Sequence, residues 1–423
     1  MSRINRVVIS LCLLVVQFSL FAQINTNSPY TRYGYGELAN RSFGAGRAMG
    51  GIGYGLRSSK QINPMNPASY SAMDSLTFLF DFGASAQLSW FDDGVNKQKN
   101  KNGNIEYLAM QFPLSRNIAM SIGLIPYSFV GYNFGSRVTD EDTPYQNQYI
   151  GTGGLNEIYG GLSIDIWKER LSFGTNVGYF FGTVSHNSNL LLEGNSFPVY
   201  KVQDFRVRDV KFDFGLQYSH PVSASERYTL GLVYSPSNRL NTTTYYREVM
   251  TQTSGSEVLD SDTTSNLAFD IPNSYGVGVS YTKRDKLTIG VDFLYEDWST
   301  ALFYDRKDEF RNRMRVAGGF EFIPGYMNRS FFQRMRYRAG VNYGNSYQQV
   351  TSSASGLNKM GYREYGASVG FGLPLIDNRS LLNISFEYTQ ISPQAKSMID
   401  EKYFRFTLNY TFNELWFYKF KLN

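Results

Sequence analysis

The chain has 423 residues, with 41 lysine and arginine residues against 36 aspartate and glutamate residues. The resulting net charge of +5 is spread along the chain without a block of five like charges, which argues against nucleic-acid binding. A mean hydropathy of −0.32 with 16% aromatic residues and 39 glycines excludes a helical membrane protein, but suits strands that need only one apolar face.

The first 22 residues have the pattern of a secretory signal peptide. Arg3 and Arg6 precede an apolar run at residues 7–21, which is shorter than the stretch of about 20 apolar residues that a spanning helix needs. We therefore expect residues 1–22 to be removed. The single cysteine, Cys12, lies inside this run, so the mature chain should contain no thiol for disulfides, catalysis or metal binding.

Residues 23–75 follow neither the period of a helix nor that of a strand. Glycine and proline are frequent here, and both disfavour regular structure. A disordered leader is one interpretation, but the aromatic and apolar content is high for disorder. We expect this segment to plug the lumen of a barrel, and the plug residues of interest are Arg47, Gly50, Gly51, Asn66, Pro67 and Ala68.

From Leu76 onward, apolar and polar side chains alternate with a period of two, as in the run from Leu287 to Phe293. Segments of roughly ten residues with this pattern recur about fourteen times, which is typical of a transmembrane antiparallel β-barrel. They lie at residues 76–90, 104–113, 118–131, 154–167, 171–184, 204–220, 226–236, 271–282, 286–298, 311–322, 334–343, 361–373, 380–391 and 401–412. Twelve or sixteen strands would also fit this pattern.

Short and long connections alternate, as expected for short periplasmic turns and long outer loops. The short ones are at residues 115–117, 168–170, 283–285 and 374–379, and the long ones at residues 140–149, 186–200, 237–265 and 347–360. An even number of strands then places both termini in the periplasm. The barrel would span residues 76–412 and leave a basic, aromatic periplasmic tail at residues 413–423.

Two other classes of protein fit the sequence less well. A soluble β-sandwich would leave the long rows of Phe and Tyr unexplained. An enzyme would need catalytic groups, but the chain has only two histidines, His186 and His220, and no Gly-x-Ser-x-Gly motif. We therefore expect no catalytic residue, no metal site and no cofactor.

Arginines recur at every second position in two of the predicted strands. An arginine that faces lipid at the membrane midplane would cost about 2–4 kcal/mol, so both sets should face the lumen. They could recognise anions or carboxylates, or they could pair with lumenal acids and plug carbonyls; we favour the pairing. The two sets are Arg311, Arg313 and Arg315, and Arg334, Arg336 and Arg338.

Pro126, followed by Gly131, stands in the third predicted strand. Proline cannot donate a hydrogen bond to a strand ladder, and a closed barrel has no edge strand. The barrel wall could therefore have a gap here that serves as a side door, or Pro126 could simply mark the end of the strand near the rim.

Three motifs precede the aromatic first strand: Ser-Pro-Tyr-Thr-Arg-Tyr-Gly at residues 28–34, the glycine cluster at residues 45–51, and Asn-Pro-Ala at residues 66–68. Together they resemble the FadL/TodX-type outer-membrane transporters of hydrophobic compounds, and most closely the branch common in Bacteroidetes. The resemblance implies a fourteen-stranded barrel, an N-terminal hatch that contains the Asn66 triplet, and lateral exit through a kinked third strand near Pro126 or Gly131. The terminal phenylalanine common in such barrels is missing.

Two functions follow from this resemblance. The first is passive uptake of hydrophobic, fatty-acid-like molecules across the outer membrane, with plug gating and lateral release. The alternative is a non-transporting barrel subunit of an outer-membrane protein assembly or secretion complex. The expected partners are outer-membrane lipid and lipopolysaccharide, hydrophobic small molecules and other envelope proteins.

Overall fold

The computed structural model describes residues 25–138, 145–167, 170–192, 197–252, 255–265, 267–284, 286–325, 328–351, 359–375, 377 and 379–415. The predicted signal peptide and the end of the predicted tail, residues 416–423, lie outside the described residues. Among the residues that the structure describes, no helix combines the length and the apolar character needed to cross a membrane.

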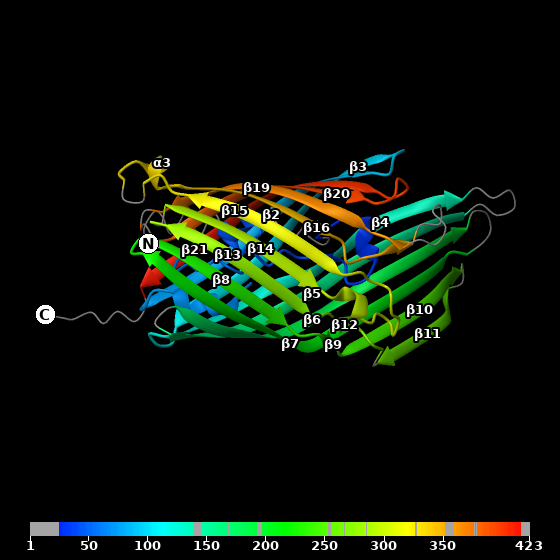
Figure 1. The fold of residues 1–423 in the computed structure, drawn as a ribbon. Coiled ribbons are helices and arrows are strands. Elements are labelled where there is room, and N and C mark those ends of the chain that lie inside the picture. The colour runs from blue at the N-terminus through cyan, green and yellow to red at the C-terminus, as the bar shows by residue number, and fades with distance from the viewer. Residues whose placement is uncertain are drawn as a thin grey trace, which may run out of the picture.

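Fourteen long antiparallel strands in the described part of the chain form one closed ring (Figure 1). Each strand pairs with the next along the ring, and the last pairs with the first, as Phe80 pairs with Phe412. The strands are β2 (Thr77–Asp92), β3 (Lys97–Pro113), β4 (Ile118–Val138), β5 (Tyr145–Trp167), β6 (Leu171–Leu192), β7 (Val199–Ser223), β8 (Glu226–Ser235), β13 (Ser274–Lys283), β14 (Leu287–Glu296), β15 (Arg313–Phe322), β16 (Arg336–Asn345), β19 (Tyr362–Pro374), β20 (Leu381–Pro393) and β21 (Asp400–Leu415). The prediction of a barrel of about fourteen strands is confirmed.

The two faces of the strands differ in chemistry as the alternation predicted. On β14, Val291 is 54% exposed on the outer face, whereas its neighbour Asp292 is 5% exposed and faces the lumen. Rows of apolar side chains on the outer face suit contact with lipid, and polar side chains on the inner face suit a wet or filled lumen.

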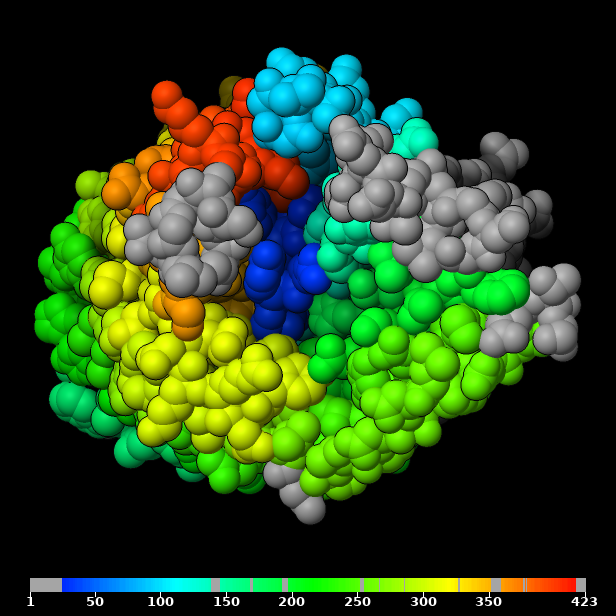
Figure 2. Space-filling view, turned by 90° about the vertical axis from the view of Figure 1, so that its right-hand side faces the viewer, coloured from blue at the N-terminus to red at the C-terminus, as the bar shows by residue number. Residues whose placement is uncertain are grey.

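The N-terminal segment, residues 25–76, lies inside the ring. It contains η2 (Pro29–Arg32), β1 (Glu37–Leu38), α2 (Gly44–Ala48) and η3 (Pro67–Ala72). Helix α2 contacts β16, β19, β20 and β21, while η3 contacts β4 to β7 on the other side of the ring. Figure 2 shows the dark-blue start of this segment in the mouth of the barrel, below the cyan β2–β3 hairpin.

Several predicted loops are in fact paired strands. Strands β5 and β6 continue well past the predicted outer limits of the barrel, and residues 242–265 form a hairpin of β10 (Thr242–Gln252) and β11 (Gly255–Ser265) that pairs with the outer half of β7. The prediction of long loops at these places was wrong. Strand β11 is almost fully exposed, and the residues that β10 buries, Thr242 and Thr244, are polar, so this hairpin lacks the one-sided apolar alternation on which the prediction rested.

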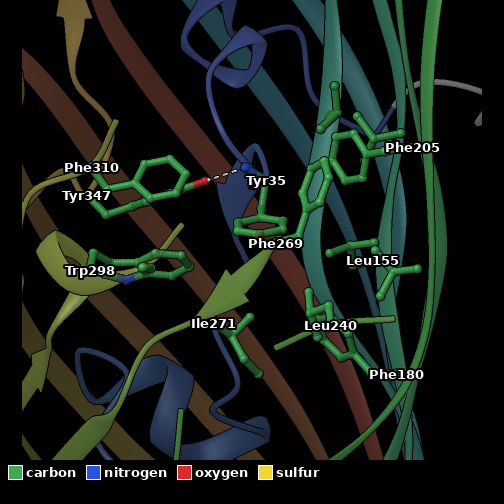
Figure 3. Packing of buried hydrophobic residues seen from close by; sticks show 14 of the residues in the cluster. Tyr35, Leu155, Phe180, Phe205, Leu240, Phe269, Ile271, Trp298, Phe310 and Tyr347 are labelled. Atoms are coloured by element: carbon green, nitrogen blue, oxygen red, sulfur yellow. Dashed lines mark hydrogen bonds between the residues drawn. The ribbon is translucent and has the colours of Figure 1, made fainter. Parts of the chain in front are cut away.

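Shorter elements complete the outer end and one turn. They are β9 (Asn238–Arg239), β12 (Asp270–Ile271), η4 (Trp298–Thr300), α3 (Phe331–Arg334), β17 (Val350–Thr351) and β18 (Lys359–Met360). Side chains of η4 and of the neighbouring loops fold into the barrel and pack against Tyr35 of the N-terminal segment. This aromatic cluster is the largest apolar core inside the ring (Figure 3).

Candidate functional site

The barrel wall is incompletely paired between β3 and β4. Their ladder runs from Pro113 opposite Ala119 only as far as Leu108 opposite Leu124. Beyond this point, residues 97–107 of β3 pair with β2 alone, and residues 125–138 of β4 pair with β5 and, over two residues, with β1. We call the unpaired stretch between these two strands the wall opening.

Pro126 stands at the start of the wall opening. It lacks an N–H group, and the register between β4 and β5 shifts between Pro126 and Ser128, so Tyr127 forms a bulge. The Tyr127 carbonyl accepts a hydrogen bond of 2.8 Å from Ala39 N–H in the N-terminal segment. The proline therefore coincides with the point where β4 changes partner from β3 to the N-terminal segment.

The N-terminal segment fills the wall opening from the lumen side. Strand β1 pairs with β4, with Leu38 opposite Ser128. Further out, the Thr31 hydroxyl donates to the Gly131 carbonyl and accepts from the Gly131 N–H, each at 3.2 Å. Gly36 has a φ of +89°, and a Cβ there would lie 2.3 Å from the Phe129 carbonyl oxygen, so only glycine fits this close approach.

The other lip of the opening also contacts the N-terminal segment. The Asn102 amide of β3 donates to the Asn27 side chain at 2.7 Å, and the Asn104 amide donates to the Asn25 carbonyl at 3.0 Å. The segment therefore connects two strands that do not pair directly with each other at this level.

Arg47 links α2 to the barrel wall. Its guanidinium lies 2.8 Å from the Glu106 carboxylate of β3 and 3.7 Å from the Glu387 carboxylate of β20, and Arg47 is 1% exposed. It also donates to the Asn40 carbonyl at 3.0 Å, which fixes the turn before α2. The arginine thus joins two strands and the segment's own backbone.

Gly50 and Gly51 form the turn after α2 with φ of +78° and +83°. The Gly50 N–H donates to the Ser368 hydroxyl at 2.9 Å, and the Gly50 carbonyl accepts from Arg315 at 2.8 Å. Glycine adopts positive φ without steric cost, so the pair allows the backbone to run against the wall.

The Asn-Pro-Ala triplet begins η3. The Asn66 side chain accepts from Ala68 N–H at 3.1 Å as an N-cap and donates to the Tyr54 carbonyl at 2.9 Å, while Pro67 occupies the first helical position. The Ala68 carbonyl then accepts from the Ser163 hydroxyl of β5 at 3.0 Å. The triplet thus turns the chain and contacts the wall.

Two further arginines of the N-terminal segment were missed by the sequence analysis. Arg41 lies 3.1 Å from both Glu157 of β5 and Asp213 of β7, and Arg57 lies 2.9 Å from Asp165. Single arginines in an aperiodic segment carry no pattern of their own. The acids opposite them stand on the polar faces of alternating strands, and that signal could have indicated lumenal partners.

The two arginine sets lie in different surroundings. Strand β15 begins at Arg313, so Arg311 lies just before this strand. Arg334 is the last residue of the short helix α3. The predicted placement of Arg311 and Arg334 on strands was therefore wrong. Every member of the sets that stands on a strand contacts an acid or a plug carbonyl: Arg313 with Glu296 at 3.1 Å, Arg336 and Arg338 with Glu321 at 2.9 and 2.6 Å, and Arg315 with the Gly50 carbonyl.

A cavity of about 190 Å³ lies between the N-terminal segment and the wall. Its lining is mixed: apolar and aromatic residues such as Leu38, Phe129 and Ile271 share it with eleven charged ones, which are Glu37, Arg41, Glu106, Lys211, Asp213, Glu296, Arg313, Arg315, Glu364, Glu387 and Arg405. Enclosure in the barrel raises the pKa of the Glu37 carboxyl, and the Arg405 guanidinium 3.6 Å away opposes this in part. In the described residues no group of three or more His, Cys, Asp or Glu side chains is arranged to hold a metal ion.

Aromatic side chains fill the outer lumen. Tyr35 is fully buried among Phe205, Trp298 and Phe310, with ring centroids 5.8 to 6.1 Å apart, and its N–H donates to the Tyr347 hydroxyl at 3.1 Å (Figure 3). Here the protein itself supplies the apolar surface that a hydrophobic ligand would contact.

A closed antiparallel barrel with apolar side chains outside and a filled polar lumen is the fold of an outer-membrane β-barrel. A protein-family model described as BamG matches residues 3–423. The chain therefore belongs to the BamG family. No curated protein matched the sequence.

Several solved structures share the fold. The CymD monoaromatic hydrocarbon channel has a TM-score of 0.59 and 14% identity over 90% of this chain and 98% of its own. A Pseudomonas aeruginosa FadL homologue has a TM-score of 0.58 and 14% identity over 89% of this chain and 99% of its own. The P. putida toluene transporter TodX has a TM-score of 0.58 and 13% identity over 90% of this chain and 100% of its own. The predicted FadL/TodX-like fold is confirmed; the Bacteroidetes branch stays a prediction.

Proposed function

We propose that this barrel lets hydrophobic, fatty-acid-like molecules cross the outer membrane passively, with the N-terminal segment as a plug. The wall opening carries the proposal: β3 and β4 do not pair with each other over this stretch, and the N-terminal segment occupies the space between them. In this proposal the end with the β10–β11 hairpin faces outward and both termini face the periplasm, with Leu415, the last described residue of β21, opposite Thr77 at the periplasmic end.

In this mechanism an apolar molecule first replaces contacts in the aromatic cluster around Tyr35. Movement of residues 25–39 then breaks the short β1–β4 pairing and the hydrogen bonds at Asn102 and Asn104. The molecule leaves sideways between β3 and β4 at the level of Ile105 and Leu124, whose exposed apolar side chains suit contact with lipid. The fourteen-stranded ladder stays closed on both sides of the opening, but this movement must also break the contacts of residues 28–36 with the outer half of the barrel, such as those of Ser28 with Glu401, Thr31 with Gly131 and Gly36 with Tyr347.

The second candidate function is a non-transporting barrel subunit of an outer-membrane protein assembly or secretion complex. Two observations favour it. Eleven charged side chains take part in lining the lumenal cavity, whereas sites for hydrophobic ligands contain only a small number of polar groups. Arg41, Arg47 and Arg57 each pair with acids on the wall, which favours a fixed plug over a moving one. Membership in the BamG family leaves this candidate open.

A disulfide between Leu38→Cys and Ser128→Cys would lock the plug into the wall opening, because these residues are direct cross-strand partners. The expected mature chain has no other cysteine. Under the transport proposal, uptake of a labelled fatty acid by cells falls at least tenfold and returns on reduction. The matched control is Thr282→Cys with Thr288→Cys, which joins two strands of the wall that are already paired.

Unchanged uptake in the locked variant, with the disulfide verified by mass spectrometry, would overturn the transport proposal. The second candidate predicts that other envelope proteins co-purify in stoichiometric amounts in mild detergent. Purification of the barrel without such partners would overturn that candidate.

A further inference from the structure

The outer face of three neighbouring strands changes from apolar to basic at one level. On β2 the even-numbered residues face outward and are apolar from Phe78 to Leu88, followed by Trp90. Trp90 pairs with Lys99 of β3 on one side and with Lys402 of β21 on the other. Leu88 pairs with Lys101. Residues directly opposite each other in a sheet share a face, so the three lysines surround Trp90 on the outside of the barrel.

The length of the apolar part places this change at the membrane surface. From Phe78 to Leu88 the strand advances ten residues. With a rise of about 3.3 Å per residue and a tilt of about 40°, this stretch spans about 25 Å, which equals the height of the apolar band of outer-membrane barrels. Trp90 and its lysines therefore lie at the level of the lipid headgroups, where tryptophan is enriched.

Within the described part of the chain, the three lysines have no acidic partner. Lys99, Lys101 and Lys402 are exposed and form no ion pair among the described residues. Lys97, one row further out, differs because it pairs with Asp92 at 3.1 Å. The nearby acids are Asp92, which is thus neutralised, Asp93, whose carboxylate accepts from the Val95 and Asn96 N–H groups of the hairpin turn, and Asp400, which lies opposite Asp92. The Trp90 row keeps a net positive charge at headgroup level.

We propose that Lys99, Lys101 and Lys402, with Trp90 between them, bind the phosphate groups of lipid A, the membrane anchor of lipopolysaccharide. Ammonium groups at this depth attract phosphorylated headgroups, and the apolar rows below them contact the acyl chains. The surface includes β3, which forms one lip of the wall opening. This inference shares the proposed orientation of the barrel but does not depend on transport.

The test compares the purified full-length barrel in detergent with the variant K99Q/K101Q/K402Q. Bisphosphorylated lipid A is titrated, and the bound lipid is counted by native mass spectrometry. The variant should bind lipid A at least tenfold more weakly, and the wild type should bind dephosphorylated lipid A as weakly as the variant does. The matched control R116Q/K286Q/R379Q removes three charges from turns at the opposite end and should bind lipid A like the wild type.

Equal binding by wild type and K99Q/K101Q/K402Q, or an equal loss in the control variant, would overturn the proposal. Binding of phosphatidylglycerol as tight as that of lipid A would also overturn it, because the site would then be a general phospholipid surface. Heat-dependent migration on gels verifies that each variant is folded. Fatty-acid uptake is measured on the same variants, so that a failure of the transport proposal is seen separately from lipid A binding.

Discussion

Single buried arginines link the N-terminal segment to the wall. Arg47 and Glu106 are almost completely buried and lie 2.8 Å apart. A buried ion pair is weak evidence for stability in itself, because removal of two charges from water opposes their attraction. Loss of one partner is different, since the remaining charge is left without compensation inside the barrel.

Arg47→Met should therefore destabilise the protein by about 3–5 kcal/mol, because it leaves Glu106 buried and unpaired. The double variant R47M/E106Q should recover much of this loss. Thermal unfolding in detergent, followed by circular dichroism, measures both. Lys97→Met removes an exposed pair with Asp92 and should change the stability by less than about 1 kcal/mol. A double variant as unstable as R47M would contradict this account.

Arg47 could be predicted from the sequence because it stands within the glycine cluster of residues 45–51. Arg41 and Arg57 could not, although their contacts with the wall are of the same kind. The reason is physical: the plug has no periodicity, so no pattern indicates which of its side chains point to the wall.

Strands with one face against lipid and one against the lumen were predicted well. All fourteen were located because burial on a single face enforces alternation. The β10–β11 hairpin was missed because β11 is exposed on both faces and the buried residues of β10, Thr242 and Thr244, are polar, so no apolar alternation marks it. The hairpin pairs with residues 199–207 of β7, whereas ring closure uses residues 214–223 of the same strand.

Removal of the hairpin should consequently leave the barrel intact. The deletion replaces residues 242–265 with Asn-Gly, which can bridge the gap because Thr243 and Ser265 are direct partners. We expect the melting temperature to change by less than about 2 °C, because roughly 1 kcal/mol corresponds to a shift of about this size or smaller in a chain of this length. Val279→Pro in β13 is the control, because it breaks a ladder within the ring and should prevent folding. A collapse of outer-membrane levels for the hairpin deletion would contradict this prediction.

On the scale of the whole molecule, the wall and the N-terminal segment fit each other through glycine. A Cβ at Gly231 would lie 1.8 Å from the Tyr54 carbonyl oxygen, and one at Gly340 would lie 2.1 Å from Gly50 N. Wall positions of this kind let the backbone of the segment approach the strands closely. The high glycine content was visible in the composition, but which glycines face the segment depends on strand register, which the sequence did not reveal.

Deletion of residues 25–75 should convert the barrel into an open pore. Fourteen strands enclose a lumen wider than the eight-stranded case that side chains can fill and narrower than a porin of sixteen strands. The ring should still close, because its ladder does not use the N-terminal segment, and the exposed acids would be hydrated by water in the lumen. Planar-bilayer recordings should show a steady conductance that the full-length protein lacks. Arg47→Met keeps the segment and should stay closed, and a deletion variant that conducts no more than the wild type would show that the outer aromatic cluster alone seals the lumen.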